Sequence, residues 1–280
     1  MAHARRSSGS IDASPTASTA TTHPVDRPTD RQELFGCAFD RVTIEEAVER
    51  CVEWCRGSRQ SHIVLTANAA IVCMKRRDPE LERACRAADM VVPDGVSVVW
   101  ASRLAGSPLP ERIAGVDFMA ALLSAASKHR LKLYFLGAKQ EVVTAMVERC
   151  RRDHPGAIIA GFRNGYFGEA QHAEIVDQIR DSGADMLFVG MPSPFKEIFC
   201  ERYRDRLNVP VMMGVGGSFD VLAGFIQRAP LWLQSIGMEW SWRLAMEPRK
   251  MWKRYLLTNT EFLLLTASVA ARRRLGIGAR

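Results

Sequence analysis

Short apolar runs alternate with segments of helical periodicity along most of this 280-residue chain, and this alternation restricts the possible folds more than any other feature. Strands that alternate with helices of about 10–15 residues indicate a parallel sheet with helices on both faces. The chain therefore predicts the α/β class, with a Rossmann-like, mostly parallel sheet. The expected strands cover residues 62–65, 90–92, 131–136, 157–160, 186–189 and 209–213.

Capping signals place the helices between these strands. Thr43-Ile44-Glu45-Glu46 is a capping box, which predicts a helix that ends near Arg56. Asp78-Pro79 combines an N-cap residue with proline at the first helical position, and so begins another helix. Further helices are expected after Asn68 and over residues 116–129, 140–152, 169–180 and 195–204.

Changes in composition divide the chain into three parts. Residues 1–32 are rich in Ser, Thr, Ala and Pro and poor in large apolar side chains, so we expect a disordered tail. Residues 33–227 form the α/β domain, and residues 228–280 form a basic, tryptophan-rich helical appendage. The N-terminus lacks the apolar segment of a secretory signal. The apolar stretch 256–271 is interrupted by Asn259 and Glu261, which disfavours a membrane-spanning helix.

The net charge of +7 is concentrated in the appendage. Residues 228–280 contain ten Arg and Lys against three Glu, and they hold four of the six tryptophans. Tryptophan together with cationic side chains favours a membrane–water interface, so we expect an interfacial amphipathic element. A helical hairpin packed on the domain with its charges in solvent is the alternative. Tryptophan- and leucine-rich helices do not offer the interleaved aromatic face that favours nucleic acid.

The carboxyl ends of the expected strands carry polar or glycine-rich segments, at the edge where open parallel sheets bind ligands. Gly216 and Gly217 precede a helix and suit a phosphate, although tight turns need glycine equally. The chain lacks both GxGxxG and GxxxxGK(S/T), so neither NAD nor P-loop ATP chemistry is supported. The segments are Thr66-Ala67-Asn68, Pro93-Asp94-Gly95, Leu136-Gly137-Ala138, Gly190-Met191-Pro192 and Gly214-Val215-Gly216-Gly217-Ser218.

Asp94 is the most informative carboxylate, because it stands between proline and glycine at a strand end. A general base could lie there in a partly dry cleft. Capping preference alone favours a different role for Asp94, as the N-cap of a helix beginning at Val96. Asp117 and Asp220 have the same alternative. Arg112 precedes a helix start, where it pairs either with a substrate anion or with a surface carboxylate.

Histidine and cysteine give no sign of a metal site. The six histidines and seven cysteines lack ligand spacing, and no DxD pair suited to a metal-bound nucleoside diphosphate occurs. We therefore expect no metal and no other cofactor. The cysteines are odd in number, scattered and without a CxxC pair, which favours a reducing, cytoplasmic compartment over a disulfide framework.

Taken together and in order, the motifs of this chain resemble those of the WecG/TagA/CpsF family, glycosyltransferase family 26, over about residues 34–257. They comprise strand ends, the loop before the helix near residue 116, and the first part of the appendage. The motifs are Thr66-Ala67-Asn68-Ala69, Val92-Pro93-Asp94-Gly95, Arg112-Ile113-Ala114-Gly115-Val116-Asp117, Leu136-Gly137, Gly165-Tyr166-Phe167, Gly190 through Glu197, Gly214-Val215-Gly216-Gly217-Ser218-Phe219-Asp220, Arg228-Ala229-Pro230, Glu239-Trp240-Ser241-Trp242-Arg243-Leu244 and Glu247-Pro248-Arg249.

The resemblance implies an inverting, metal-independent transfer of a sugar from a UDP-sugar to a saccharide on undecaprenyl diphosphate, at the inner face of the cytoplasmic membrane. Members of this family make lipid-linked intermediates of cell-envelope polymers and exopolysaccharides. By motif, Asp94 resembles the general base for the acceptor hydroxyl, and Arg112 the group that stabilises the acceptor or the leaving diphosphate. The residues implied on the donor side, in the sugar pocket or beside UDP, are Thr66, Asn68, Tyr166, Gly216, Gly217 and Asp220.

The resemblance also implies a second role for the appendage. Its cations are expected to close over the crevice and bind the lipid diphosphate, so that membrane binding completes the active site. A chain that ends near residue 228 is then expected to fold but to lose turnover. The cations concerned are Arg243, Arg249, Lys250, Lys253 and Arg254.

Two departures from the family pattern bear on specificity. Lys196 stands before Glu197, where family members often have glutamine. We expect Lys196 to face the donor, which favours a donor with an added negative charge; contact with the diphosphate is the alternative. Lys250 and Lys253 replace arginines that are common in the family, and they keep the charge without the bidentate geometry.

Two other interpretations stay open at this point. One is a catalytically silent, membrane-attached nucleotide-binding assembly factor, and the other is a cytosolic nucleotide-sugar modifier that needs no lipid. The sequence leaves the transferred sugar open among ManNAc, ManNAcA, glucose and glucuronic acid. The identity of the acceptor saccharide and homo-oligomerisation are open as well.

Overall fold

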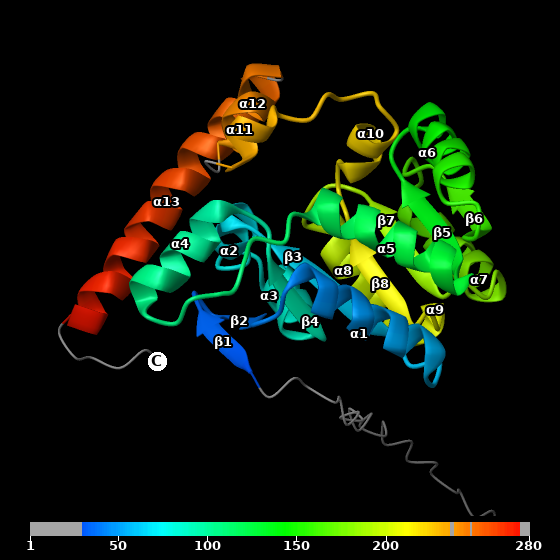
Figure 1. Cartoon of the computed structure of the whole chain (residues 1–280), viewed down its shortest axis with the longest axis horizontal. Coiled ribbons are helices and arrows are strands. Elements are labelled where there is room, and N and C mark those ends of the chain that lie inside the picture. Colours follow the sequence, from blue (N-terminus) through cyan, green and yellow to red (C-terminus); the bar gives the residue numbers. More distant parts are fainter. Residues whose placement is uncertain (1–29, 236–237, 247, 275–280) are drawn as a thin grey trace, which may run out of the picture.

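The computed structural model describes residues 30–235, 238–246 and 248–274, and its centre is a six-stranded sheet (Figure 1). Every neighbouring pair of strands in this sheet is parallel. The expected strands are all present, so the predicted α/β class with a parallel sheet is confirmed. Across the sheet they are β4 (Met90–Pro93), β3 (His62–Ala67), β8 (Val211–Gly214), β7 (Met186–Gly190), β5 (Lys132–Gly137) and β6 (Ile158–Arg163).

Helices cover both faces of the sheet, because both faces of its strands are apolar. In β5 and β7, Phe135 and Phe188 enter one hydrophobic layer, whereas Leu136 and Val189 enter the other. The first layer is closed by α1 (Ile44–Arg56), α5 (Gly115–His129), α6 (Gln140–Asp153) and α10 (Ser218–Leu222). The second is closed by α2 (Ala69–Met74), α3 (Pro79–Arg86), α4 (Val96–Ala105), α7 (His172–Asp181, preceded by the short turn Glu169–Gln171), α8 (Phe195–Arg202) and α9 (Arg204–Leu207).

The predicted helix caps are confirmed in atomic detail. At the start of α1 the Glu46 amide donates to Thr43 Oγ1 at 3.3 Å, and the Thr43 amide donates to Glu46 Oε2 at 2.8 Å. At the start of α3 the Asp78 carboxylate accepts from the amides of Glu80 and Leu81, each at 3.1 Å. Each side chain satisfies amides that have no partner within the helix.

The folded domain begins earlier than the sequence predicts. β1 (Arg31–Leu34) and β2 (Cys37–Asp40) form an antiparallel hairpin, so the expectation of disorder is wrong for residues 31 and 32. The fully buried Asp40 carboxylate fixes this hairpin, because it pairs with Arg31 at 2.9 Å and Arg50 at 3.3 Å and accepts from the Val91 amide at 2.8 Å. Composition alone does not reveal such a pairing. The rest of the expected tail, residues 1–29, lies outside the described residues.

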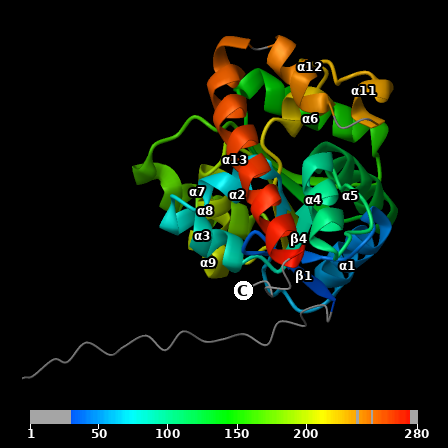
Figure 2. The same ribbon diagram turned by 90° about the vertical axis from the view of Figure 1, so that its left-hand side faces the viewer.

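The appendage contains α11 (Leu231–Ser235), α12 (Glu239–Met246) and α13 (Pro248–Arg274), and α13 runs across α2 and α4 (Figure 2). The Phe262 side chain of α13 is buried, with its ring centroid 5.0 Å from that of Phe35. On α2, the Cys73 thiol donates to the Thr258 carbonyl at 3.5 Å. The packing partner of α13 is therefore the domain itself. Among the described residues, no helix combines the length and the apolar character needed to cross a membrane.

Replacing Phe262 with alanine tests this packing. Removal of a buried phenylalanine side chain leaves a cavity, so Phe262→Ala is expected to lower the free energy of unfolding by about 3–5 kcal/mol. Leu263, the next residue of α13, is 68 % exposed. The substitution Leu263→Ala is therefore expected to change the free energy of unfolding by less than about 0.5 kcal/mol. Urea unfolding followed by circular dichroism measures both values. Equal effects of the two substitutions would contradict the packing of α13 described above.

Candidate active site

The carboxyl ends of β3 and β4 bring three predicted site residues together. β3 and β4 are neighbours in parallel register, and the Asp94 amide donates to the Ala67 carbonyl at 3.0 Å. Thr66, near the end of β3, is buried, whereas Asp94 and Asn68 are partly exposed. Thr66, Asn68 and Asp94 thus lie at the same edge of the sheet, as the sequence predicts.

Gly115, the first residue of α5, lies against this group. A Cβ atom built on Gly115 would lie 3.4 Å from Thr66 Oγ1 and 3.9 Å from Asp94 Oδ2. The start of α5 therefore approaches both side chains closely, and glycine keeps the space between them open. The loop that leads to it is anchored to β4, because the Ile113 amide donates to the Pro93 carbonyl at 2.9 Å.

The N-cap role that capping preference favours for Asp94 is wrong. The helix beginning at Val96 is present as α4, but its N-cap position is taken by Gly95, one residue after Asp94. Gly95 has φ of 140°, a conformation that glycine adopts readily and other residues rarely do. The N-cap nearby is Asn68, whose Oδ1 accepts from the Ile71 amide at 3.2 Å at the start of α2.

The glycines at the other strand ends pack backbone against backbone. A Cβ on Gly137 would lie 2.5 Å from the carbonyl carbon of Gly190, and the Gly165 amide donates to the Ala138 carbonyl at 2.8 Å. Gly216 has φ of 53° and donates to the Val189 carbonyl at 3.4 Å. These close backbone contacts explain why glycine occupies the tight turns at Gly137, Gly165 and Gly216. An anion-binding role for Gly216 and Gly217 stays a prediction.

Two further predicted donor residues flank these turns. Tyr166 follows Gly165 at the end of β6, and its side chain is 72 % exposed. Asp220 lies in the first turn of α10 and is partly exposed. Both side chains are thus open to solvent near the carboxyl edge of the sheet, and their roles beside UDP stay predictions.

Lys196 lies deeper than the sequence suggests. Its side chain is buried and donates a hydrogen bond to Glu197 Oε1, which also accepts from Ser193 Oγ at 2.9 Å. A Cβ on Gly214 would lie 2.9 Å from Lys196 Cδ, so the lysine stem packs directly against the end of β8. The stem of Lys196 therefore supports the turn that begins at Gly214, and its ammonium group balances the charge of Glu197. A contact with the donor stays a prediction.

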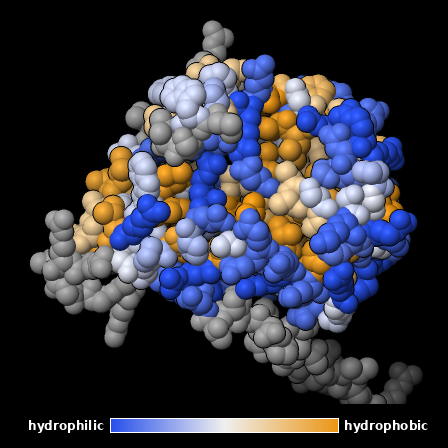
Figure 3. Space-filling model, viewed as in Figure 1, coloured by the Kyte–Doolittle hydropathy of each residue, from blue (hydrophilic) through white to orange (hydrophobic). Residues whose placement is uncertain are grey.

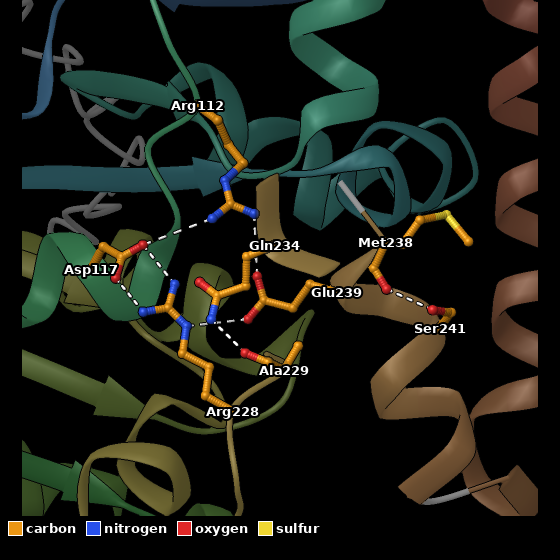
Figure 4. Close-up of polar contacts among 8 residues, drawn as sticks. All are labelled: Arg112, Asp117, Arg228, Ala229, Gln234, Met238, Glu239 and Ser241. Carbon is orange, nitrogen blue, oxygen red and sulfur yellow. Dashed lines mark hydrogen bonds and ion pairs between the residues drawn. The ribbon is translucent and has the colours of Figure 1, made fainter. Parts of the chain in front are cut away.

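Arg112 takes part in a network of ion pairs (Figure 4). Its guanidinium donates to Glu239 Oε2 at 3.2 Å and lies 3.8 Å from Asp117 Oδ2. Arg228 joins the same carboxylates, with Nη2 2.6 Å from Asp117 Oδ2 and Nε 3.4 Å from Glu239 Oε1. The hydrogen bonds from Asp117 raise the pKa of the Arg228 guanidinium above its ordinary value. The sequence predicts that Arg112 pairs either with a substrate anion or with a carboxylate of the protein. In this structure it pairs with the carboxylates of Asp117 and Glu239.

Sequence reasoning assigned no role to Gly115, Arg228 or Glu239. All three stand in motifs that mark the family resemblance, which is the only signal that could have singled them out. The predicted appendage cations occupy helical positions: Arg243 in α12, and Arg249, Lys250, Lys253 and Arg254 in α13. The side chains of these five residues lie outside what the structure describes.

Comparison with known proteins gives a consistent result. The family model described as "Glycosyl transferase WecG/TagA/CpsF family" matches residues 32–276. Relatives named "N-acetylglucosaminyldiphosphoundecaprenol N-acetyl-beta-D-mannosaminyltransferase" occur in several bacteria. The protein from Bacillus spizizenii is 38 % identical over 69 % of this chain and 74 % of its own length. Those from Bacillus subtilis and Staphylococcus aureus are 34 % and 31 % identical, over 69 % and 81 % of this chain and 75 % and 87 % of their own lengths.

Proposed function

Because this chain belongs to the WecG/TagA/CpsF family of glycosyltransferases, we propose that it transfers N-acetylmannosamine from a UDP-sugar to N-acetylglucosaminyl diphosphoundecaprenol. The observation that carries the proposal is the group at the ends of β3 and β4. A carboxylate, a hydroxyl and the glycine start of a helix meet there, and Arg112 lies three residues before that glycine. Family membership also favours an enzyme over the silent assembly factor.

In the proposed reaction Asp94 removes the proton from the acceptor hydroxyl. The acceptor oxygen then forms a bond to the anomeric carbon while the bond from that carbon to the UDP oxygen breaks, and UDP leaves with the electron pair. A single displacement of this kind inverts the anomeric configuration, so an α-linked donor yields the β-linked product that the relatives' names specify. Arg112 is the nearby cation that can stabilise charge on a diphosphate.

The remaining donor contacts are assigned by motif and position. Thr66 and Asn68 adjoin Asp94 and are suited to the sugar, since each offers a short polar side chain at the strand end. The nucleoside diphosphate is assigned to the neighbouring turns. Its proposed contacts are Tyr166, Gly216, Gly217 and Asp220, with Lys196 beneath the turn.

We assign the appendage, residues 228–280, to peripheral attachment at the cytoplasmic membrane. Its described part exposes large apolar side chains, among them Trp232 on α11, Trp240 on α12, and Trp252, Leu263 and Leu264 on α13. Figure 3 shows apolar side chains on the side of the molecule where α13 and α4 lie. Exposed apolar and aromatic groups beside basic positions suit the interface of an anionic membrane.

The Gly115→Ala substitution tests the geometry of the reaction centre. Alanine suits the first turn of a helix, so the stability of the fold is expected to stay unchanged. The new methyl group lies 3.4 Å from Thr66 Oγ1 and 3.9 Å from Asp94 Oδ2, which are ordinary contact distances, so it takes up space beside Asp94 without moving either side chain. Displacement of a substrate atom from this space by about 1 Å costs about 100-fold in rate. We therefore expect kcat/KM to fall by about 10- to 100-fold. Gly168→Ala is the control, because a Cβ at Gly168 meets nothing within 4 Å.

A panel of UDP-sugars tests the substrate assignment. UDP-N-acetylmannosamine, UDP-N-acetylmannosaminuronic acid, UDP-glucose and UDP-glucuronic acid are each offered with a lipid-linked N-acetylglucosaminyl diphosphate and with free N-acetylglucosamine. The highest kcat/KM is expected for UDP-N-acetylmannosamine with the lipid-linked acceptor. Preference for an acidic sugar would overturn the sugar assignment and support a role of Lys196 toward a charged donor. Equal transfer to the free sugar would favour a modifier that needs no lipid.

A further inference from the structure

The four side chains Arg112, Asp117, Arg228 and Glu239 form a closed ring of ion pairs between the domain and the appendage (Figure 4). Arg112 lies in the loop before α5, and Asp117 in the first turn of α5. Arg228 lies after α10, and Glu239 is the first residue of α12. The ring thus joins the helix that begins at the reaction centre to the first part of the appendage.

The two carboxylates are held unequally. Asp117 uses both oxygens on Arg228, with contacts of 2.5 and 2.6 Å, which is the strong bidentate arrangement. Glu239 makes one contact of 3.2 Å to Arg112 and one of 3.4 Å to Arg228. Asp117 therefore fixes the direction of the Arg228 guanidinium, whereas Glu239 is the more weakly held partner.

Solvent reaches every member of the ring. The side chains of Arg112, Glu239 and Arg228 are 19 %, 26 % and 27 % exposed, and that of Asp117 is 40 % exposed. Because solvent reaches all four groups, an anion from solution can approach the guanidiniums and compete with Glu239 for them. Two guanidiniums that face one loosely held carboxylate offer more donors than a single carboxylate can use. Their geometry and combined charge suit a group with two linked anionic centres.

We propose that Arg112 and Arg228 together bind a diphosphate, and that Glu239 occupies this anion site until the diphosphate replaces it. The inference rests on the proposed function, which supplies diphosphates on both the donor and the acceptor. It makes Arg228 a second diphosphate-binding residue and Asp117 the positioning residue that orients Arg228.

Displacement of Glu239 also removes its ion pair with Arg112, which links the first turn of α12 to the domain. The hydrogen bond from Trp242 to the Gln227 carbonyl is left as a remaining link of that turn. Diphosphate binding therefore weakens the attachment of the appendage at this point.

Direct binding measurements on the full-length protein test the proposal without any need for turnover. UDP and farnesyl diphosphate serve as probes, in isothermal titration calorimetry at one fixed, low salt concentration. Glu239→Gln removes the competing charge, so the Kd is expected to fall by about tenfold. Arg228→Gln removes a guanidinium, so the Kd is expected to rise by about tenfold. If the ring has only a structural role, neither substitution lowers the Kd for a probe.

Two matched variants control for general charge effects. Glu261 in α13 pairs with Arg77 of the domain at 2.8 Å, so this pair also links the appendage to the domain, away from the ring. Glu261→Gln and Arg77→Gln change the total charge by the same amounts and are expected to leave both Kd values unchanged. In the Arg228→Gln background, the gain from Glu239→Gln is expected to shrink, because the two side chains act on the same ligand.

The outcomes separate the donor from the acceptor and the inference from the proposed function. Tightening for UDP alone assigns the site to the donor diphosphate, and tightening for farnesyl diphosphate alone assigns it to the acceptor. An unchanged or raised Kd for both probes in Glu239→Gln, or tightening equal to that of Glu261→Gln, overturns the inference. Sugar transfer by the unaltered protein is assayed separately. Absent transfer with clear tightening refutes the proposed function and leaves the anion site in place.

Discussion

The Asp94→Asn substitution is expected to lower kcat for sugar transfer by at least about 100-fold, the usual lower range for removal of a general base. Asparagine keeps the size and shape of the side chain but cannot accept the proton of the acceptor hydroxyl. Because the proposed UDP contacts lie at other strand ends, the Kd for UDP is expected to stay within about twofold, well under the tenfold that 1.4 kcal/mol represents. Steady-state kinetics with the lipid-linked acceptor and calorimetry with UDP give the two values.

Asp78→Asn is the matched control for this experiment. Asp78 is, like Asp94, a partly exposed aspartate of the domain, but its carboxylate caps α3. Asparagine is an equally good N-cap residue, so Asp78→Asn is expected to preserve both stability and transfer. Unchanged transfer by Asp94→Asn would exclude Asp94 as the base. Loss of UDP binding together with transfer would instead assign Asp94 to the donor site.

Neutralising the five appendage cations is expected to abolish attachment to anionic vesicles. Each Lys or Arg near an anionic surface contributes about 1 kcal/mol, so five of them account for about 5 kcal/mol, or three to four powers of ten in partitioning. Transfer to an acceptor embedded in vesicles is expected to fall with attachment, whereas UDP binding is expected to persist. The substitutions are Arg243→Gln, Arg249→Gln, Lys250→Gln, Lys253→Gln and Arg254→Gln.

The control for this variant carries the same change in charge at the opposite edge of the sheet. Its five positions are exposed and lie near the amino ends of the strands or at the C-terminal ends of α1, α6 and α7. They are Arg56, Lys132, Arg151, Arg152 and Arg180. Flotation with vesicles that contain phosphatidylglycerol compares the two variants. Equal loss of flotation would show that total charge, and not the appendage, determines attachment.

These substitutions are a sharper test than deletion of the appendage. The sequence predicts that a chain ending near residue 228 folds, because composition does not reveal which surface of the domain the appendage covers. The structure buries Phe262 of α13 beside Phe35 and pairs the Cys73 thiol with the Thr258 carbonyl. Deletion would expose this apolar surface and lower stability at the same time as it removed the cations. Neutralisation changes the charge and keeps the packing.

Features that depend on local periodicity were predictable from the sequence. Strands such as β7 are buried on both faces and therefore appear as continuous apolar runs. The capping box at Thr43 satisfies the first amides of its own helix, so it needs no distant partner. The edge position of Thr66 and Asp94 followed from the strand assignment alone, since ligand sites in open parallel sheets lie at the carboxyl ends.

Features that depend on distant partners were not predictable in this way. The hairpin at Arg31 requires a buried Asp40 that also contacts β4, and single-sequence composition treats Arg31 as part of a polar tail. Lys196 was expected to face a donor, because nothing in the sequence places its stem against Gly214. The pairing of Arg228 with Asp117 joins residues that are 111 positions apart.

The packing of α13 on α2 has a mechanical consequence for the proposed reaction centre. α2 is six residues long, with Asn68 at its N-terminus and Cys73, near its other end, in contact with α13. A helix of that length spans about 9 Å, so the α13 contact and Asn68 lie at the two ends of one short, rigid element. In the proposed attachment to a membrane, α13 is therefore separated from Asn68, a residue proposed to contact the sugar, by the length of this one short helix.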